Sequence, residues 1–146
     1  MAPASASYDA AWVWKRVPVF FGLFSLAPGL LYQYVQDHAR QNAADAQGPL
    51  RIALDVAPNA LGALAAASAI FVMGLGIAKA AGPLRVAIAS AAIAIAGLAG
   101  WEVAQIAIPG ATFDPEDLKW TLAGGGAFLI AAIGFFPPAS KAKDRG

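Results

Sequence analysis

The chain has 146 residues, of which 59% are apolar and only 13% are charged, about half the charged fraction of a water-soluble domain. A formal net charge of +1, from ten dispersed Lys and Arg residues, excludes the basic stripe of a nucleic-acid-binding protein. The chain has no cysteine and a single histidine, His38, which excludes disulfides, cysteine-bound clusters and a bis-histidine haem. This composition favours a single transmembrane domain over residues 1–146, with no cofactor and with the lipid bilayer as its main partner.

Four apolar stretches are long enough to cross a bilayer, which requires about 20 helical residues. We expect spans at approximately 17–36, 53–78, 85–108 and 118–137. The third stretch reaches spanning length only because it continues past Glu102 to Pro109, which places this carboxylate inside the span. The sequence therefore predicts an all-α, polytopic membrane protein with four transmembrane helices.

The first apolar stretch could also belong to a cleaved signal peptide, because Lys15 and Arg16 precede it and small residues follow at 44–46. The stretch is longer than the apolar region of a typical signal peptide, and the small residues lie well beyond its end. A retained first helix is the better interpretation.

The distribution of Lys and Arg predicts the orientation, since cytoplasmic loops are enriched in these residues. One side of the four-span arrangement carries Lys15, Arg16, Lys79, Arg85, Lys141, Lys143 and Arg145. The other side carries Arg40, Arg51 and Lys119. We therefore expect both termini, with short tails at 1–14 and 139–146, to be cytoplasmic.

Three of the predicted spans contain a polar pair at helical spacing near their outer end. The pairs are Asp55 with Asn59, Glu102 with Gln105, and Asp117 with Thr121. Residues three or four apart share one face of a helix, and the three pairs lie at a similar depth. A carboxylate at that depth needs a partner or a water-filled recess. We expect these six residues to form an outward-facing polar cluster that binds a ligand, and we assign no catalytic or metal-binding residue.

A purely structural interpretation also accounts for part of this cluster. Asp55 and Asp117 suit helix starts, where the helix dipole favours carboxylates, and the neutral members can form hydrogen bonds between helices. Glu102 fits less well, because it lies near a helix C-terminus, where the dipole disfavours negative charge. We expect it either to be protonated or to pair with one of the nearby cations, Arg51, Arg40 or Lys119.

Several glycines indicate close helix contacts, since small residues allow membrane helices to approach. Gly62 and Gly124 each follow an Asp by seven residues, in two segments with the same order of polar residues. Tight packing within the bundle is expected at both, and also at Gly97, Gly100, Gly125 and Gly126.

The stretch 101–124, WEVAQIAIPGATFDPEDLKWTLAG, resembles the signature of the VanZ-like membrane family. In that family one span ends in Glu and Gln, and the next opens with Asp, Asn and Gly. The matching residues are Glu102, Gln105, Asp117 and Gly124, and Asn59 resembles an earlier family asparagine. There are two departures: Ala111 and Thr112 stand where the family commonly has an arginine, and Thr121 stands where asparagine is usual.

The resemblance implies a small multi-pass protein of the bacterial inner (cytoplasmic) membrane, whose biochemistry is undefined and some of whose relatives are linked to glycopeptide resistance. Our first hypothesis is that the polar cluster binds a lipid-linked or headgroup ligand of the cell envelope. The alternative is a structural or accessory subunit of a larger membrane protein complex. An enzyme is less favoured, because the carboxylates are accompanied by no nucleophile–histidine pair or phosphate-binding loop. An ion pathway is disfavoured because the acids gather at one end of the spans.

Overall fold

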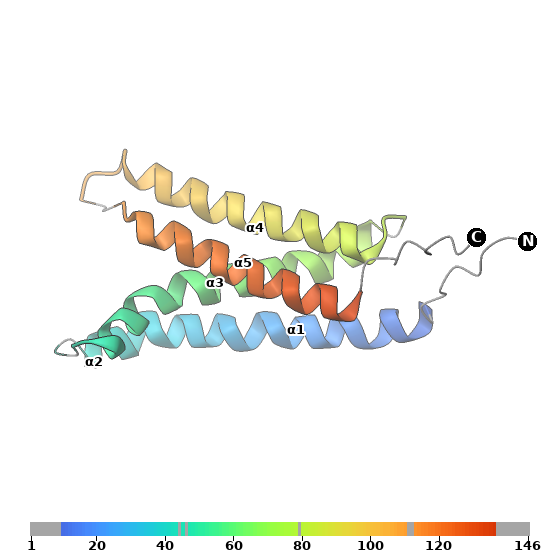
Figure 1. Cartoon of the computed structure of the whole chain (residues 1–146), viewed down its shortest axis with the longest axis horizontal. Coiled ribbons are helices and arrows are strands. Elements are labelled where there is room, and N and C mark those ends of the chain that lie inside the picture. The colour runs from blue at the N-terminus through green and yellow to red at the C-terminus, as the bar shows by residue number, and fades with distance from the viewer. Residues whose placement is uncertain (1–9, 44, 46, 79, 111–112, 137–146) are drawn as a thin grey trace, which may run out of the picture.

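The computed structural model describes residues 10–43, 45, 47–78, 80–110 and 113–136, and every regular element within them is helical (Figure 1). The elements are α1 (Ala10–Tyr34), the π-helical turn η1 (Val35–Ala39), α2 (Arg40–Asn42), α3 (Pro49–Ile77), α4 (Pro83–Gln105) and α5 (Pro115–Phe135). Four helices are long and apolar enough to cross a membrane. The prediction of an all-α protein with four spans is thereby confirmed, whereas the side on which the termini lie stays a prediction. Most of the two predicted tails falls outside the described residues.

Three of the four long helices begin with a proline. Pro49, Pro83 and Pro115 open α3, α4 and α5. Proline suits the first helical turn, because the N–H that it lacks would have no partner there and its φ is already helical. The helices therefore start slightly before the residues at which we expected the spans to begin, 53, 85 and 118.

The first helix does not end where we expected it to. Instead of giving way to a loop after residue 36, the chain continues helically through η1 and α2 to Asn42. In η1 the Arg40 N–H donates to the Val35 carbonyl, five residues back. Such π-turns are rare and often occur at functional sites. Arg40 consequently lies on a helix, one turn beyond Gln36.

The helices form an antiparallel bundle around α3, which packs on α1, α4 and α5, while α4 also packs on α5. Within the described residues, α1 and α4 form no contact of this extent. The α1–α3 and α4–α5 connections lie at one end of the bundle, here termed the cavity end (Figure 1). The start of α1, the α3–α4 connection and the end of α5 lie at the other, here termed the phenylalanine end.

Aromatic rings fill the phenylalanine end. Phe21 of α1 is fully buried, and its ring centroid lies 4.8 Å from that of Phe71 on α3 and 5.5 Å from that of Phe128 on α5. Both contacts are edge-on, an arrangement that aromatic quadrupoles favour. Alanines of α4, among them Ala87 and Ala91, complete this core. Three helices are therefore joined through one ring.

The helices approach most closely at two glycines of α5. A Cβ on Gly124 would lie 2.1 Å from the carbonyl oxygen of Ala60, and a Cβ on Gly125 would lie 2.6 Å from Cδ1 of Ile95. These distances confirm the prediction of tight packing at both positions. The same prediction is wrong for Gly97, Gly100 and Gly126, because a Cβ there would meet nothing within 4 Å, and at Gly62 a Cβ would be in ordinary van der Waals contact, at 3.6 Å from Tyr32.

Large apolar side chains cover the outer faces of the bundle. Leu30, Ile77 and Ile130 are 71%, 86% and 74% exposed, and they lie on three different helices. A water-soluble monomer rarely exposes large apolar side chains along all of its long helices. These faces are suited to contact with lipid chains.

Candidate functional site

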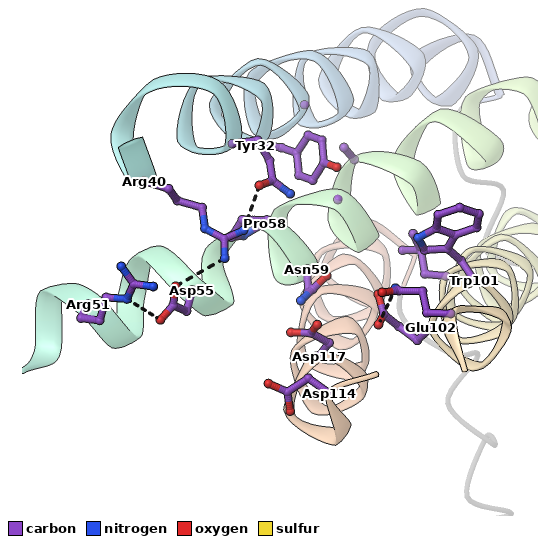
Figure 2. A pocket seen from close by; sticks show the side chains of 16 residues that line it. Tyr32, Arg40, Arg51, Asp55, Pro58, Asn59, Trp101, Glu102, Asp114 and Asp117 are labelled. Carbon is purple, nitrogen blue, oxygen red and sulfur yellow. Dashed lines mark hydrogen bonds and ion pairs between the residues drawn. The ribbon is translucent and has the colours of Figure 1, made fainter. Parts of the chain in front are cut away.

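A cavity of about 800 Å³ lies at the cavity end and is lined by all four long helices (Figure 2). Its walls contain five of the six residues expected in the polar cluster: Asp55, Asn59, Glu102, Gln105 and Asp117. Thr121 is the exception, because it is 2% exposed, buried within the bundle, and not among the lining residues. The fold thus brings polar residues of α3, α4 and α5 to a single space.

One face of α3 forms a continuous wall of this space. The lining residues Asp55, Pro58, Asn59, Gly62 and Ala65 recur at helical spacing. A Cβ on Gly62 would lie 3.6 Å from the ring of Tyr32 on α1. That is an ordinary van der Waals distance, so the ring of Tyr32 lies against this face of α3 at the edge of the cavity.

Two arginines bind Asp55 on one side of the cavity. The Arg51 Nε donates to Oδ2 at 2.8 Å, and the Arg40 Nη2 lies 3.5 Å from Oδ1. The Arg40 Nη1 also donates to Oε1 of Gln36 at 2.9 Å. All three charged side chains are 39–45% exposed, so each pair contributes little to stability. Asp55 neutralises only one of the two positive charges, and this side remains cationic.

Carboxylates gather on the other side of the cavity. Glu102 lies in the last turn of α4 and is only 7% exposed, and its Oε2 accepts a hydrogen bond from Gln105 Nε2 at 2.9 Å. Asp117 lies in the first turn of α5, where the helix dipole favours it, and Asp114 precedes that helix. Asp117 is close enough to Glu102 and Asp114 for electrostatic repulsion, and close enough to Arg40 for a weaker attraction.

The cations expected beside Glu102 are engaged elsewhere. Arg40 and Arg51 bind Asp55, and Lys119 Nζ pairs with the Glu116 carboxylate, which is not part of the cavity lining. For the described part of the chain, the expectation that one of them pairs with Glu102 is therefore wrong. The carboxylate is held by Gln105 and faces another carboxylate.

Sequence reasoning assigned no site residue before α3, yet α1, η1 and α2 supply part of the wall. Gly29, Tyr32, Gln36 and Arg40 all line the cavity. They are three or four residues apart, and therefore share one face. Tyr32 and Gln36, four residues apart near the end of the apolar stretch, were the available signal. Trp101 of α4 also lines the cavity and is 60% exposed.

The chemistry that the site offers is binding by charge and hydrogen bonds. Among the described residues, no group of three His, Asp or Glu side chains is placed to hold a metal ion. The two sides instead present guanidinium donors and carboxylate acceptors across one cavity. A ligand with groups of both charges would satisfy them together.

Comparison with known proteins identifies no relative. No family model matches the chain, and neither does any curated protein or solved structure. The VanZ-like resemblance of residues 101–124 therefore stays a prediction from the sequence.

Proposed function

We propose that this chain is a VanZ-like, multi-pass protein of the bacterial inner membrane that binds an envelope or lipid-headgroup ligand in its cavity. The observation that carries the proposal is the convergence of polar side chains from four helices on one space. Ionisable residues inside membrane spans are costly, and they generally mark functional sites. Glu102 carries the most weight, because it is nearly buried and lies at a helix end where the dipole disfavours its charge.

The proposal requires the cavity end to face outward, in agreement with the excess of Lys and Arg on the opposite side. The chain has no cysteine, so single cysteines can be introduced for labelling without first removing native ones. In intact cells a membrane-impermeant maleimide should label Glu116→Cys, at the cavity end. It should label Ala80→Cys, at the phenylalanine end, only after the membrane is opened. The reverse pattern would contradict the orientation.

Substitution of the buried carboxylates tests the function itself. Glu102→Gln and Asp117→Asn should change the sensitivity of the host to envelope-directed antibiotics, while the protein still accumulates in the membrane. Glu116→Gln is the matched control, because its carboxylate is adjacent to Asp117 in sequence but lies outside the cavity lining. Sensitivity equal to that of the unmodified protein in both cavity variants would count against ligand binding.

One observation favours the alternative of an accessory subunit in a larger membrane complex. Ala92, Ala96, Gly100 and Ala104 recur every four residues along α4, and all are exposed. Faces of small residues are the usual contact surfaces of membrane helices. Purification under native conditions distinguishes the two functions, since migration only as a free monomer or homodimer would contradict the accessory role.

A further inference from the structure

The cavity has two sides of opposite charge, one at the start of α3, which carries Arg51 and Asp55, and one on α4 and α5 (Figure 2). Arg40 and Arg51 surround Asp55 on the first side, and Glu102 and Asp117 occupy the second. A purely anionic ligand would satisfy the arginines but would meet the carboxylates, whereas a purely cationic ligand would do the opposite. A zwitterion of matching polarity satisfies both sides.

The carboxylate side is suited to a primary ammonium group. Glu102 and Asp117 repel each other, and a cation between them would convert this repulsion into two attractions. Asn59 and Gln105 add amide oxygens to the same wall. A primary ammonium has three N–H donors to distribute among these oxygens, whereas a quaternary ammonium has none.

The arginine side is suited to a phosphate. Each guanidinium carries five N–H donors in a planar fork. Arg51 uses Nε for Asp55, and Arg40 uses Nη1 and Nη2 for Gln36 and Asp55. Donors remain on both side chains, and arginine forks bind phosphate oxygens well.

The remaining lining is suited to contact with the acyl chains of a lipid. Gly29 on α1, Ala65 on α3 and Leu98 on α4 lie further from the cavity end along their helices than the charged residues do. This deeper part of the wall is apolar. The deeper lining comes from α1, α3 and α4, and α1 and α4 do not pack closely on each other in the described residues, so the acyl chains of a lipid bound here would pass between these two helices.

We propose that the cavity binds the phosphoethanolamine headgroup of a membrane lipid, with its phosphate at Arg40 and Arg51, its ammonium at Glu102 and Asp117, and its acyl chains leaving between α1 and α4. The inference rests on the proposed function and specifies its ligand. It predicts selectivity for a lipid with a phosphate and a primary ammonium over lipids that have the phosphate but no ammonium N–H donors.

Binding by the full-length protein tests this selectivity. Native mass spectrometry in detergent would compare phosphatidylethanolamine, phosphatidylglycerol and phosphatidylcholine with identical acyl chains. We expect phosphatidylethanolamine to bind at least about tenfold more tightly than the other two, since a charge-assisted contact is absent from each competitor. Equal or tighter binding of phosphatidylglycerol would overturn the inference.

Two variants separate the two sides of the cavity. Asp117→Asn should reduce the affinity for phosphatidylethanolamine to near that for phosphatidylglycerol, because only the first lipid has an ammonium group. Arg40→Gln should weaken both lipids alike, because they share the phosphate. Glu116→Gln is the control and should leave all affinities unchanged. Monodispersity and the melting temperature of each variant would establish that it is folded. A folded Asp117→Asn variant with unaltered selectivity would overturn the assignment.

Competition with soluble phosphoethanolamine identifies the source of the group. The intact lipid should bind at least about tenfold more tightly than the soluble headgroup, because its chains add apolar contacts. Equal affinities would overturn the lipid as the source. If phosphatidylglycerol bound as tightly as phosphatidylethanolamine, and its binding depended on Arg40 but not on Asp117, the phosphoethanolamine inference would be wrong and the proposed function would still hold. If the cavity variants bound every lipid as the unmodified protein does, both the inference and the proposed function would be wrong.

Discussion

The two ends of the bundle are built from the same four helices but differ in packing and polarity. At the phenylalanine end, Phe21 contacts rings of two other helices and leaves no exposed surface on its own side chain. At the cavity end the helices enclose about 800 Å³ lined by charged and amide groups. One end maximises packing, whereas the other keeps a space open.

The difference shows where the stability of this protein resides. In a bilayer, apolar side chains gain little by leaving lipid for protein, so packing and hydrogen bonds hold helices together. The phenylalanine end supplies that packing, and Gly124 brings α3 and α5 together between the two ends. The cavity end can then retain groups that repel each other, in keeping with the general trade between stability and function.

Truncating the central ring is the strongest test of this division. Phe21→Ala should lower the free energy of unfolding by about 2–4 kcal/mol, because it removes contacts with Phe71 and Phe128 and leaves an unfilled space. The loss should lie toward the low end of that range, because an apolar ring gains little free energy on moving from lipid into the protein interior, so its removal forfeits mainly packing contacts. Leu23→Ala, at a position 62% exposed on the same helix, is the control and should cost much less. Unfolding by detergent titration measures both, and equal losses would refute the division.

Gly124→Ala tests the contact between the two ends. Its Cβ would lie 2.1 Å from the Ala60 carbonyl oxygen, so α5 must move away from α3. We expect a loss of about 1–3 kcal/mol, which is typical of overpacking. Gly126→Ala is the matched control, because its Cβ meets nothing within 4 Å and alanine favours a helix. A Gly124→Ala variant as stable as the Gly126→Ala variant would show that the close approach is unimportant.

The spans could be predicted because a bilayer imposes a length and an apolar composition on each crossing segment. The helix starts did not follow from the same signal, because hydropathy locates apolar residues and the helices begin earlier, at Pro49, Pro83 and Pro115. The extension of the first helix through Asp37, His38 and Arg40 was missed. Charged residues that follow an apolar stretch usually indicate a loop. No local sequence pattern predicts a π-turn.

Most of the polar cluster was also predictable, since residues of similar depth on antiparallel neighbours can meet. The pairing of the charges was not. Asp55 forms ion pairs with both Arg51, four residues before it on α3, and Arg40 of α2. Glu102 pairs with neither. Thr121 shares a helical face with Asp117 by spacing, yet it is buried in the bundle away from the lining. Such outcomes depend on helix rotation, which single-chain periodicity does not fix.

Neutralising the buried carboxylate should sharpen the contrast between the ends. Glu102→Gln keeps a side chain that can accept the Gln105 hydrogen bond and removes the repulsion from Asp117. We expect the free energy of unfolding to rise by about 1 kcal/mol or less, whereas truncation at the phenylalanine end lowers it. The same detergent titration measures it. A clear loss of stability would mean that the charge of Glu102 holds the fold together.

The smallest effect is expected where the charges are most exposed. Asp55→Asn removes both arginine pairs, but the three side chains are 39–45% exposed, and exposed pairs contribute about 0.2–1 kcal/mol. We expect a loss within that range at low salt and almost none at high salt, because ions screen such pairs. Detergent titration at two salt concentrations measures the difference, with Glu116→Gln as the control for an exposed pair outside the cavity. A loss comparable to that of Phe21→Ala and independent of salt would show that the arginine side is a structural element, and the contrast between the two ends would disappear.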